Sequence, residues 1–416
     1  MSRIIAEYLI ETSYPVEKAA EIMAGEQSCG TFVKVAGETD ELREQFSAKV
    51  VKTEELGTVE KPALSGSKPY KGDNGAVYKR AVVTLSWPLE NVGVNLPNII
   101  STVAGNLYEL SPFSGLKLIH LELPDEMTSV YKGPQFGIKG TQELAGVKNR
   151  PVIGTIIKPS VGLSPEATAE RVKTLIESGL DFIKDDELMG NPPHSPFEKR
   201  VKLVMKVINE YAEKTGKKPM YAFNVSGDID DMLRFHDIVK ENGGTCVMVN
   251  LNSVGVSGVA KLRQHSELPI HGHRNGWGAM SRYKVLGMTY QPYQTIWRTV
   301  GVDHMHVNGL RNKFCETDES VLASIKALLK PMYGGYQAMP VISSGQWAGQ
   351  AVDTYNAIKT TDVMFLAGGG IVGHPDGIDA GVKSILQAWE AALNGISLND
   401  MASKHKELKK ALEFYG

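Results

Sequence analysis

A strand-like segment of this chain ends in a run of charged side chains that could bind a metal ion. Residues 179–187 read Gly-Leu-Asp-Phe-Ile-Lys-Asp-Asp-Glu, so that Lys184, Asp186 and Glu187 follow an apolar stretch. Because side chains alternate along a strand, Lys184 and Asp186 share one face and Asp185 takes the other. Carboxylate oxygens suit a hard cation such as Mg²⁺, and an uncharged lysine amine can react with CO₂ to give a carbamate, a further oxygen ligand. A solvated loop, or a lysine that neutralises two acids, would show the same run.

Length and charge limit the kinds of protein and partner. The chain has 416 residues, 42% of them hydrophobic, enough for a core domain of about 250 residues and a smaller one. Its 45 Lys and Arg against 47 Asp and Glu give a net charge of −2, so no overall field attracts nucleic acid or an anionic membrane. The expected partner is a small molecule. Cys29, Cys246 and Cys315 match no zinc or redox spacing. Without a recognisable signal peptide or membrane span, we expect a soluble cytoplasmic protein.

The pattern of the chain changes near residue 130, which predicts two domains. Residues 1–130 mix strand-like and helix-like runs, as in a small α+β domain of the ferredoxin-like type. A stretch rich in Pro, Gly, Ser and Lys from Glu60 to Gly75 is predicted to be an exposed loop. Residues 131–416 are expected to form a catalytic domain with additional C-terminal helices. The runs of the first domain are Ile4–Ile10, Ala81–Trp87 and Leu116–Leu123 as strands, and Pro15–Gly25 and Ile99–Leu110 as helices.

Short apolar strands alternate with amphipathic helices through the second domain. Helix-like stretches over Pro165–Ser178, Phe197–Thr215 and Asp230–Glu241 repeat apolar residues every three or four positions, and Ser164 can cap the first. Eight strands in this alternation predict a (β/α)₈ TIM barrel; the alternative, a doubly wound open sheet, lacks a Gly-x-Gly-x-x-Gly after its first strand. The candidate strands are Pro151–Pro159, Leu180–Asp186, Pro219–Val225, Cys246–Leu251, Leu268–His273, His304–Asn308, Met339–Ser343 and Val363–Ala367.

Polar residues end every candidate strand, and in a barrel of this kind the active site lies at the carboxyl ends of the strands. Each buried polar group costs stability unless something binds it, so the set indicates one active site, although His271 taken alone is more simply a packed histidine. Small residues after the last two strands place backbone N–H groups where barrels bind phosphate, or form flexible turns. In order, the ends are Lys158; Lys184 to Glu187; Asn224; Asn250; His271, His273 and Arg274; His304 and His306; Ser343 to Gly345; and Gly368 to Gly370.

On these motifs the chain resembles the large subunit of ribulose-bisphosphate carboxylase/oxygenase (Rubisco), and more closely the Rubisco-like proteins that do not fix carbon. The resemblance runs nearly from end to end. It implies that Lys184 is carbamylated and binds Mg²⁺ with Asp186 and Glu187, and that Lys158 handles a proton. The segments His273-Arg274 and Asp303-His304-Met-His306 are similar to those that hold substrate oxygens and phosphate. Lys313 lies where the sixth barrel loop of the carboxylases carries a lysine.

The same resemblance implies a phosphate site and a shared active site. Ser343, Gly345, Gly368 and Gly369 match hydroxyl and phosphate contacts of the family. The segments that contain Glu26, Thr31 and Asn106 resemble those with which a neighbouring subunit completes the active site. At least a homodimer is therefore implied.

Three positions depart from the pattern of the carboxylases. Ser160 replaces a second lysine, Trp277 replaces a further histidine, and Phe32 replaces a tryptophan. Loss of a cation and an imidazole argues against CO₂ fixation. A metal to polarise a ketone, a group to move a proton and an anchor for one phosphate remain, which is the apparatus for a metal-bound enediolate.

Several reactions share that intermediate, and we expect decarboxylation of a phosphorylated keto sugar acid, 3-oxo-isoapionate 4-phosphate. Lys313 favours this choice, because a cation near a departing carboxylate is useful to a decarboxylase. The alternatives are the 2,3-diketo-5-methylthiopentyl-1-phosphate enolase and the methylthioribulose-phosphate isomerase of methionine salvage. A non-catalytic sugar-phosphate-binding protein is a further alternative, although a complete metal cluster is costly to keep without a cation.

Overall fold

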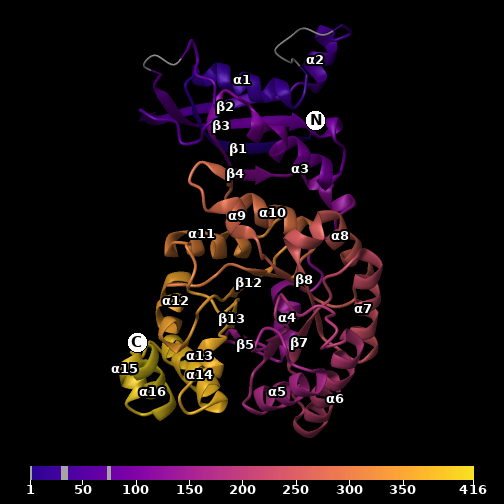
Figure 1. Ribbon diagram of the computed structural model, residues 1–416, viewed down its shortest axis with the longest axis vertical. Helices are drawn as coiled ribbons and strands as arrows, with labels where there is room; N and C mark the ends of the chain where they lie inside the picture. Colours follow the sequence, from indigo (N-terminus) through magenta and orange to yellow (C-terminus); the bar gives the residue numbers. More distant parts are fainter. Residues whose placement is uncertain (1, 30–35, 73–75) are drawn as a thin grey trace. The chain divides into compact units, whose positions relative to one another are not determined.

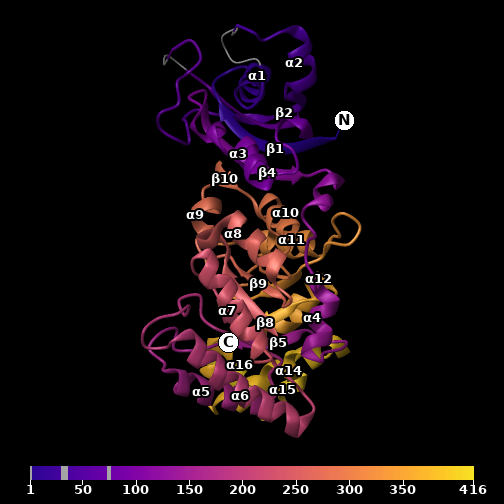
Figure 2. The same cartoon turned by 90° about the vertical axis from the view of Figure 1, so that its right-hand side faces the viewer.

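The computed structural model describes residues 2–29, 36–72 and 76–416, which form two compact units (Figure 1, Figure 2). The first unit comprises residues 1–132 and 276–299, and the second comprises residues 133–275 and 300–416. Residues 276–299, which the sequence analysis assigns to the barrel domain, therefore group with the first unit. Within the described ranges, no helix is long and apolar enough to cross a membrane.

The first unit is built on a five-stranded sheet with the order β10-β4-β1-β3-β2. Neighbouring strands are antiparallel, except that β10 runs parallel to β4. Along the chain, α1 and α2 lie between β1 and β2, and α3 lies between β3 and β4. With the sheet order β4-β1-β3-β2, this is the ferredoxin-like arrangement that the sequence predicts. The strands are β1 Arg3–Thr12, β2 Lys49–Val59, β3 Tyr78–Pro88, β4 Phe113–Glu122 and β10 Leu286–Met288; the helices are α1 Val16–Glu26, α2 Asp40–Phe46, α3 Leu96–Ala104, α9 Trp277–Ser281 and α10 Tyr290–Val300.

Strand β2 was not expected from the sequence. It reads Lys-Val-Val-Lys-Thr-Glu-Glu-Leu-Gly-Thr-Val and is exposed over most of its length, so it lacks the alternation of apolar and polar residues that marks a half-buried strand. Its position at the edge of the sheet explains why it tolerates charge.

The second unit is a closed barrel of eight parallel strands in the order β5-β6-β7-β8-β9-β11-β12-β13. All eight candidate strands of the sequence analysis are confirmed, and the open-sheet alternative is wrong, because β13 pairs with β5 and closes the circle. Figure 2 shows α7 and α8 outside β8 and β9. The strands are β5 Val152–Ile156, β6 Phe182–Lys184, β7 Met220–Asn224, β8 Cys246–Asn250, β9 Ile270–His273, β11 His304–His306, β12 Met339–Ile342 and β13 Met364–Leu366.

Helices cover the barrel, and those predicted from the sequence form close to the expected positions. Ser164 accepts a hydrogen bond from the backbone N–H of Ala167 and so caps α5, as its position before the helix predicts. The helices of this unit are α4 Gly137–Ala145, α5 Pro165–Glu177, α6 Phe197–Thr215, α7 Ile229–Glu241, α8 Leu251–His265, α11 Asp318–Leu329, α12 Ala351–Ile358, α13 Gly369–Val372, α14 Ile378–Asn394, α15 Leu398–Ala402 and α16 Lys406–Tyr415.

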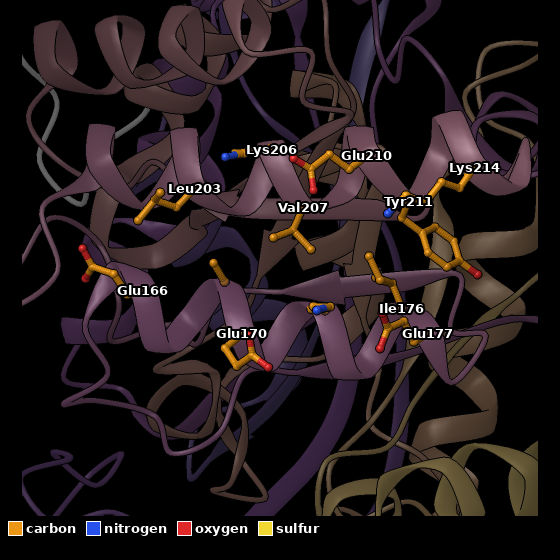
Figure 3. A pocket seen from close by; sticks show the side chains of 12 residues that line it. Glu166, Glu170, Ile176, Glu177, Leu203, Lys206, Val207, Glu210, Tyr211 and Lys214 are labelled. Carbon is orange, nitrogen blue, oxygen red and sulfur yellow. The ribbon is translucent and has the colours of Figure 1, made fainter.

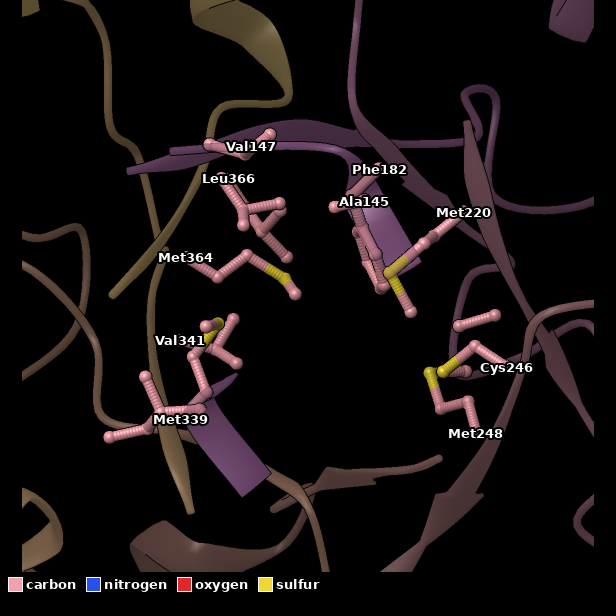
Figure 4. Packing of buried hydrophobic residues seen from close by; sticks show 13 residues of the cluster. Ala145, Val147, Phe182, Met220, Cys246, Met248, Met339, Val341, Met364 and Leu366 are labelled. Atoms are coloured by element: carbon pink, nitrogen blue, oxygen red, sulfur yellow. The ribbon is translucent and has the colours of Figure 1, made fainter. Parts of the chain in front are cut away.

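The amino-terminal half of the barrel interior is apolar and closed by α4. Figure 4 shows this cluster, in which methionines from four strands face each other. Ala145 and Ile138 of α4 pack against it. Asp303, just before β11, fixes the start of α4 by accepting the backbone N–H groups of Phe136 and Gly137 at 2.6 and 2.9 Å. Polar side chains are thus left to the carboxyl-terminal half, apart from a set of buried histidines described below.

Candidate active site

Lys184 ends β6 inside the barrel. Its side chain is 1% exposed, and its Nζ lies 2.8 Å from the backbone oxygen of Asp185 and 3.9 Å from Glu187 Oε2. Burial lowers the pKa of Lys184, because a charged amine loses its hydration there. The uncharged amine, which is the form that reacts with CO₂, is therefore more populated than in an exposed lysine.

Asp186 projects toward the carboxyl end of β5. Lys158 Nζ lies 2.8 Å from Asp186 Oδ2 and 2.7 Å from Ser160 Oγ. Burial alone would raise the pKa of Asp186, but the hydrogen bond and charge of Lys158 hold that pKa below its ordinary value. Asp186 is thus kept ionised. Ser160, where the carboxylases carry a second lysine, here serves as a partner of Lys158.

Glu187 is the most accessible member of the acidic cluster, with a side chain 35% exposed. His273 Nε2 lies 3.5 Å from its Oε2. Two carboxamides hold its backbone: Asn224 Nδ2 donates to its carbonyl oxygen at 3.1 Å and Asn250 Nδ2 at 2.9 Å. The sequence marked both asparagines as polar strand ends but did not assign them this role, which depends on three strands meeting.

Asp185 points to the opposite face from Lys184, as the alternation of a strand predicts. It accepts hydrogen bonds from Tyr221 Oη at 2.6 Å, Arg200 Nη2 at 3.3 Å and the backbone N–H of Asn224 at 3.0 Å. Arg200 is fully buried. Sequence reasoning missed both side-chain partners, although an arginine on the apolar face of the helix over Phe197–Thr215 was an available signal.

The donor set fits a hard divalent cation. Lys184 Nζ, Asp186 and Glu187 come from one short segment and can supply oxygen ligands once the amine carries a carbamate. Two buried atoms beside them, Asn250 Oδ1 and His273 Nδ1, have no hydrogen-bond partner among the described residues. Buried polar atoms of this kind are usually satisfied by protein, water or a ligand, so the region is suited to hold further polar groups.

Three histidines from β9 and β11 line the other side of the interior. His306 Nε2 lies 2.8 Å from His271 Nε2, and His306 Nδ1 lies 2.9 Å from Ser343 Oγ. The rings of His273 and His306 are 4.7 Å apart between centroids. Burial lowers the pKa of His271, His273 and His306 well below the ordinary value, so all three rings are neutral.

Arg274, predicted to contact phosphate, is paired with a carboxylate of its own chain. Its Nη2 lies 2.7 Å from Glu316 Oε2, and Asn308 Nδ2 donates to the same oxygen at 2.6 Å. Ser344 Oγ donates to Asn308 Oδ1 at 2.6 Å. Both Asn308 and Ser344 have positive φ, 62° and 72°. Sequence reasoning missed Glu316, Asn308 and Ser344, because loop conformations of this kind leave little periodic signal.

Lys313 lies in the loop after β11 with an exposed side chain. Its backbone N–H donates to the carbonyl oxygen of Ser344 at 3.1 Å, and its Nζ lies over the ring of Phe314 at 5.2 Å. In this arrangement the loop is anchored beside Gly345, while the amine does not join the acidic cluster.

The glycines expected at the phosphate site lie in two adjoining turns. Gly345 has φ 85°, a left-handed conformation that favours glycine. A Cβ on Gly370 would lie 2.5 Å from the carbonyl oxygen of Gln346, so the turns after β12 and β13 approach closely. No atom lies within 4 Å of a Cβ built on Gly369, and only Ile156 Cδ1 approaches one on Gly368. These two glycines border open space at the start of α13.

The remaining predicted contacts lie in the first unit. Glu26 is the last residue of α1 and Asn106 begins a short 3₁₀ helix, and both are exposed. Thr31 lies outside the described residues, as does Phe32. Trp277 stands where the carboxylases carry a histidine. It packs against Tyr293 with 4.6 Å between ring centroids, an aromatic contact that suits an apolar side chain at this position.

Two other polar features lie outside the barrel interior. A groove of about 440 Å³ between α5 and α6 carries alternating acids and lysines, shown in Figure 3, whose opposite charges compensate each other. His236, Asp237 and His265 cluster on α7 and α8. There, His236 Nε2 accepts the backbone N–H of Glu267 at 3.3 Å, so the ring proton is on Nδ1 and is donated to Asp237. Neither feature has the convergence of groups found at the strand ends.

The fold and these strand ends define a (β/α)₈-barrel protein with a cluster of a buried lysine and carboxylates at the carboxyl face. Comparison with known proteins places it more narrowly. The N-terminal domain of the ribulose bisphosphate carboxylase large chain matches residues 1–127, and its catalytic domain matches residues 137–415. The chain belongs to the Rubisco large-chain family.

Two relatives that match the chain over nearly its full length are named for different activities on the same substrate. The chain is 52% identical to the 3-oxo-isoapionate-4-phosphate transcarboxylase/hydrolase of Xanthobacter autotrophicus, over 99% of both chains. It is 44% identical to the 3-oxo-isoapionate-4-phosphate decarboxylase of Rhizobium etli, over 98% of both. These names support an enzyme rather than a binding protein.

Solved structures agree with the fold. A Rubisco-like protein from Burkholderia fungorum superposes with a TM-score of 0.92 at 43% identity, covering 100% of both chains. A dimeric archaeal Rubisco from Hyperthermus butylicus gives a TM-score of 0.86 at 28% identity, covering 100% of this chain and 96% of the other.

Proposed function

We propose that this protein cleaves the carboxyl group from 3-oxo-isoapionate 4-phosphate and releases it as CO₂, with Mg²⁺ as cofactor. The observation that carries the proposal is the full-length similarity to relatives named for this substrate. A 3-oxo acid has a ketone β to its carboxylate, so the electrons of the broken C–C bond can move toward the keto oxygen.

The acidic cluster is the proposed metal site, with Lys184 as its carbamate, Asp186 and Glu187 as ligands. Bound Mg²⁺ would supply a Lewis acid for the keto oxygen. Lys158 is placed to hold and return the proton, because Asp186 Oδ2 and Ser160 Oγ orient its Nζ from two sides. His273, which is neutral, can donate to a substrate oxygen or accept from a substrate hydroxyl group without adding charge, and His306 lies behind Ser343, 2.9 Å from its Oγ.

A substrate with one phosphate suits the arrangement of anion-binding groups. The proposed phosphate contacts are Gly345, Gly368 and Gly369, and Ser343 is the proposed contact for a substrate hydroxyl group. Arg274, the other expected anion contact, is already neutralised by Glu316 at 2.7 Å. A second phosphate at Arg274 would have to displace that carboxylate, which is partly buried and held by two further donors.

A second candidate is transfer of the carboxyl group followed by hydrolysis, which the 52% identical relative favours. Cleavage of the same C–C bond starts both reactions, and the fate of the carboxyl carbon distinguishes them. Substrate labelled with ¹³C at the carboxyl group decides the question. Label in dissolved CO₂ supports the decarboxylase, and label in an organic product supports the transferase.

The same experiment tests the proposal as a whole. Turnover should require Mg²⁺ and stop on chelation. If the labelled substrate is not consumed, and a methylthio diketo phosphate is tautomerised or methylthioribulose phosphate is isomerised instead, the site serves methionine salvage. If no such substrate reacts but a sugar phosphate binds, the protein is a binding protein.

We also propose that the active site is shared in a homodimer, through Glu26, Thr31 and Asn106 of the partner. Lys184→Ala and Asn106→Ala subunits should each be inactive alone. Mixed under exchange conditions, they should regain activity, because a hybrid dimer contains one intact site. Demonstrated exchange without recovery contradicts the shared site.

A further inference from the structure

A continuous line of side chains crosses the barrel core from α4 to the carboxyl face. Thr141 of α4 touches His304, His304 touches His271, His271 touches His306, and His306 touches Ser343. The nitrogen and oxygen distances are 2.8, 3.3, 2.8 and 2.9 Å in that order. All three histidines are buried, with exposures of 0, 0 and 6% for His271, His304 and His306.

The hydroxyl proton of Thr141, at the α4 end of this line, has one possible position. Thr141 Oγ1 also contacts the carbonyl oxygen of Gly137, which can only accept, so the single hydroxyl proton of Thr141 is used there. The oxygen of Thr141 is then an acceptor toward His304. His304 must therefore carry its proton on Nε2.

The remaining protons follow from that one. A neutral imidazole has one N–H, so His304 Nδ1 is bare and accepts from His271 Nδ1. His271 Nε2 is in turn bare and accepts from His306 Nε2. His306 Nδ1 is then bare and accepts the hydroxyl proton of Ser343.

The neutrality on which this order depends has a physical cause. Burial lowers the pKa of His304 to about 3 and those of His271 and His306 well below the ordinary value. A second proton on His304 or His271 would face a nitrogen donor of the neighbouring ring, and a second proton on His306 would face the hydroxyl group of Ser343.

The line of hydrogen bonds ends at Ser343, in the proposed active site. Ser344 Oγ uses its own proton on Asn308 Oδ1, so it could only accept from Ser343, and it lies 3.4 Å away, farther than the 2.9 Å to His306 Nδ1. With its proton committed to His306, Ser343 can meet a ligand only through oxygen lone pairs. A substrate hydroxyl group, which can donate, fits this oxygen, whereas a phosphate or carboxylate oxygen does not.

We propose that Thr141 is a positioning residue that sets the proton order of the three histidines, so that Ser343 meets the substrate as a hydrogen-bond acceptor for a hydroxyl group. The assignment of Ser343 to substrate rests on the proposed function, and the proton order does not. Thr141 acts through His304, His271 and His306, from the amino-terminal end of the barrel, without touching the ligand.

The test reads the ring protons directly, by nitrogen NMR of protein labelled with ¹⁵N in histidine and free of ligand. In the unchanged protein, His304 and His306 should carry the proton on Nε2 and His271 on Nδ1. Single His→Gln variants assign the signals. Thr141→Val removes the acceptor with little change of shape, and all three tautomers should invert. Thr141→Ser, the matched control, should keep the original order.

Turnover of the proposed substrate provides a second reading. With the order inverted, Ser343 accepts from His306 and its own proton turns toward the hydroxyl group that the substrate would donate, so kcat/KM of Thr141→Val should fall about five- to tenfold, the scale of one neutral hydrogen bond. Thr141→Ser should restore it. If no substrate turns over, the proposed function fails while the NMR result stands on its own.

Two outcomes overturn the inference. One is an Nδ1 proton on His306 in the unchanged protein, a result that needs no variant to fold. The other is a folded Thr141→Val protein, checked by circular dichroism, in which all three tautomers stay as before.

Discussion

The two sides of the barrel's carboxyl end satisfy their polar groups in opposite ways. The ionic side, Lys158, Lys184, Asp186 and Glu187, contains charges near one another, with adjacent buried atoms of Asn250 and His273 that no described residue satisfies. The neutral side, His271, His304, His306 and Ser343, forms an unbroken line of hydrogen bonds. The first needs a ligand to complete it, and the second is complete by itself.

This difference assigns different costs to the two sides. A buried amine next to carboxylates loses its hydration, and only its polar partners can offset that loss of free energy. The ionic side therefore lowers the stability of the fold. Neutral rings that satisfy each other cost little while they remain neutral. Removing a charge should therefore abolish function and spare the fold, whereas adding a charge to the neutral side should damage the fold.

The largest expected effect is loss of activity in Lys184→Met. Without the amine no carbamate can form, and Mg²⁺-dependent turnover should fall on the order of a thousandfold or more. The free energy of unfolding in urea should stay equal or rise, because a buried amine is replaced by an apolar chain of similar length. Lys202→Met, at an exposed surface ion pair, is the control. Normal turnover in Lys184→Met would remove Lys184 from the metal site.

The neutral side should make stability depend on pH. His271, His304 and His306 each have a folded-state pKa below the unfolded value of about 6.5, so their contribution is present above that pH and lost as pH falls toward the folded value, about 3 for His304. Each such histidine lowers the free energy of unfolding by up to about 1.4 kcal/mol per pH unit in this window.

Urea unfolding between pH 7.5 and 5 measures this loss before most carboxylates begin to titrate. The slope gives the number of protons taken up on unfolding, and we expect it to correspond to several histidines. A free energy of unfolding that does not change over this range would show that the buried rings already carry charge.

The ionic side was accessible from the sequence, and most of the neutral side was not. The segment over residues 179–187 combines an apolar strand with a specific motif, and the eight strands follow from a repeated local pattern. By contrast, the partners of Asp185, Arg200 and Tyr221, come from two other elements, and only their three-dimensional packing joins them. The strand ends identified His271, His304 and His306, but their proton order needs distances and the position of Thr141.

A change at Lys313, in the loop after β11, should separate loss of the carboxyl group from enolisation. Its effect on activity should be intermediate in size. If Lys313 meets the departing carboxylate, Lys313→Met should reduce carboxyl loss from a β-keto acid phosphate by about a hundredfold, the scale of one preorganised charge contact. Proton exchange next to the ketone in an analogue without the carboxylate should change far less, because the ionic side remains intact. Lys330→Met, at an exposed lysine just after α11, is the control. Equal losses in both assays would assign Lys313 to loop closure.

Glu316 pairs with Arg274 and should produce the smallest effect. Its carboxylate occupies Arg274, which leaves one anion site for a substrate phosphate. In Glu316→Gln the guanidinium loses this counter-charge and becomes available to a second phosphate. Calorimetric titration with a pentitol 1,5-bisphosphate should then show about tenfold tighter binding than in the unchanged protein, as expected for one hydrogen bond to a charged group. Binding of the corresponding monophosphate should change little. Glu319→Gln, an exposed neighbour on α11 with the same change of charge, should leave both affinities as they are. Equal bisphosphate affinities in the unchanged protein and Glu316→Gln would mean that Glu316 already leaves Arg274 when an anion arrives, and the preference for one phosphate would then have to arise at Gly368 and Gly369.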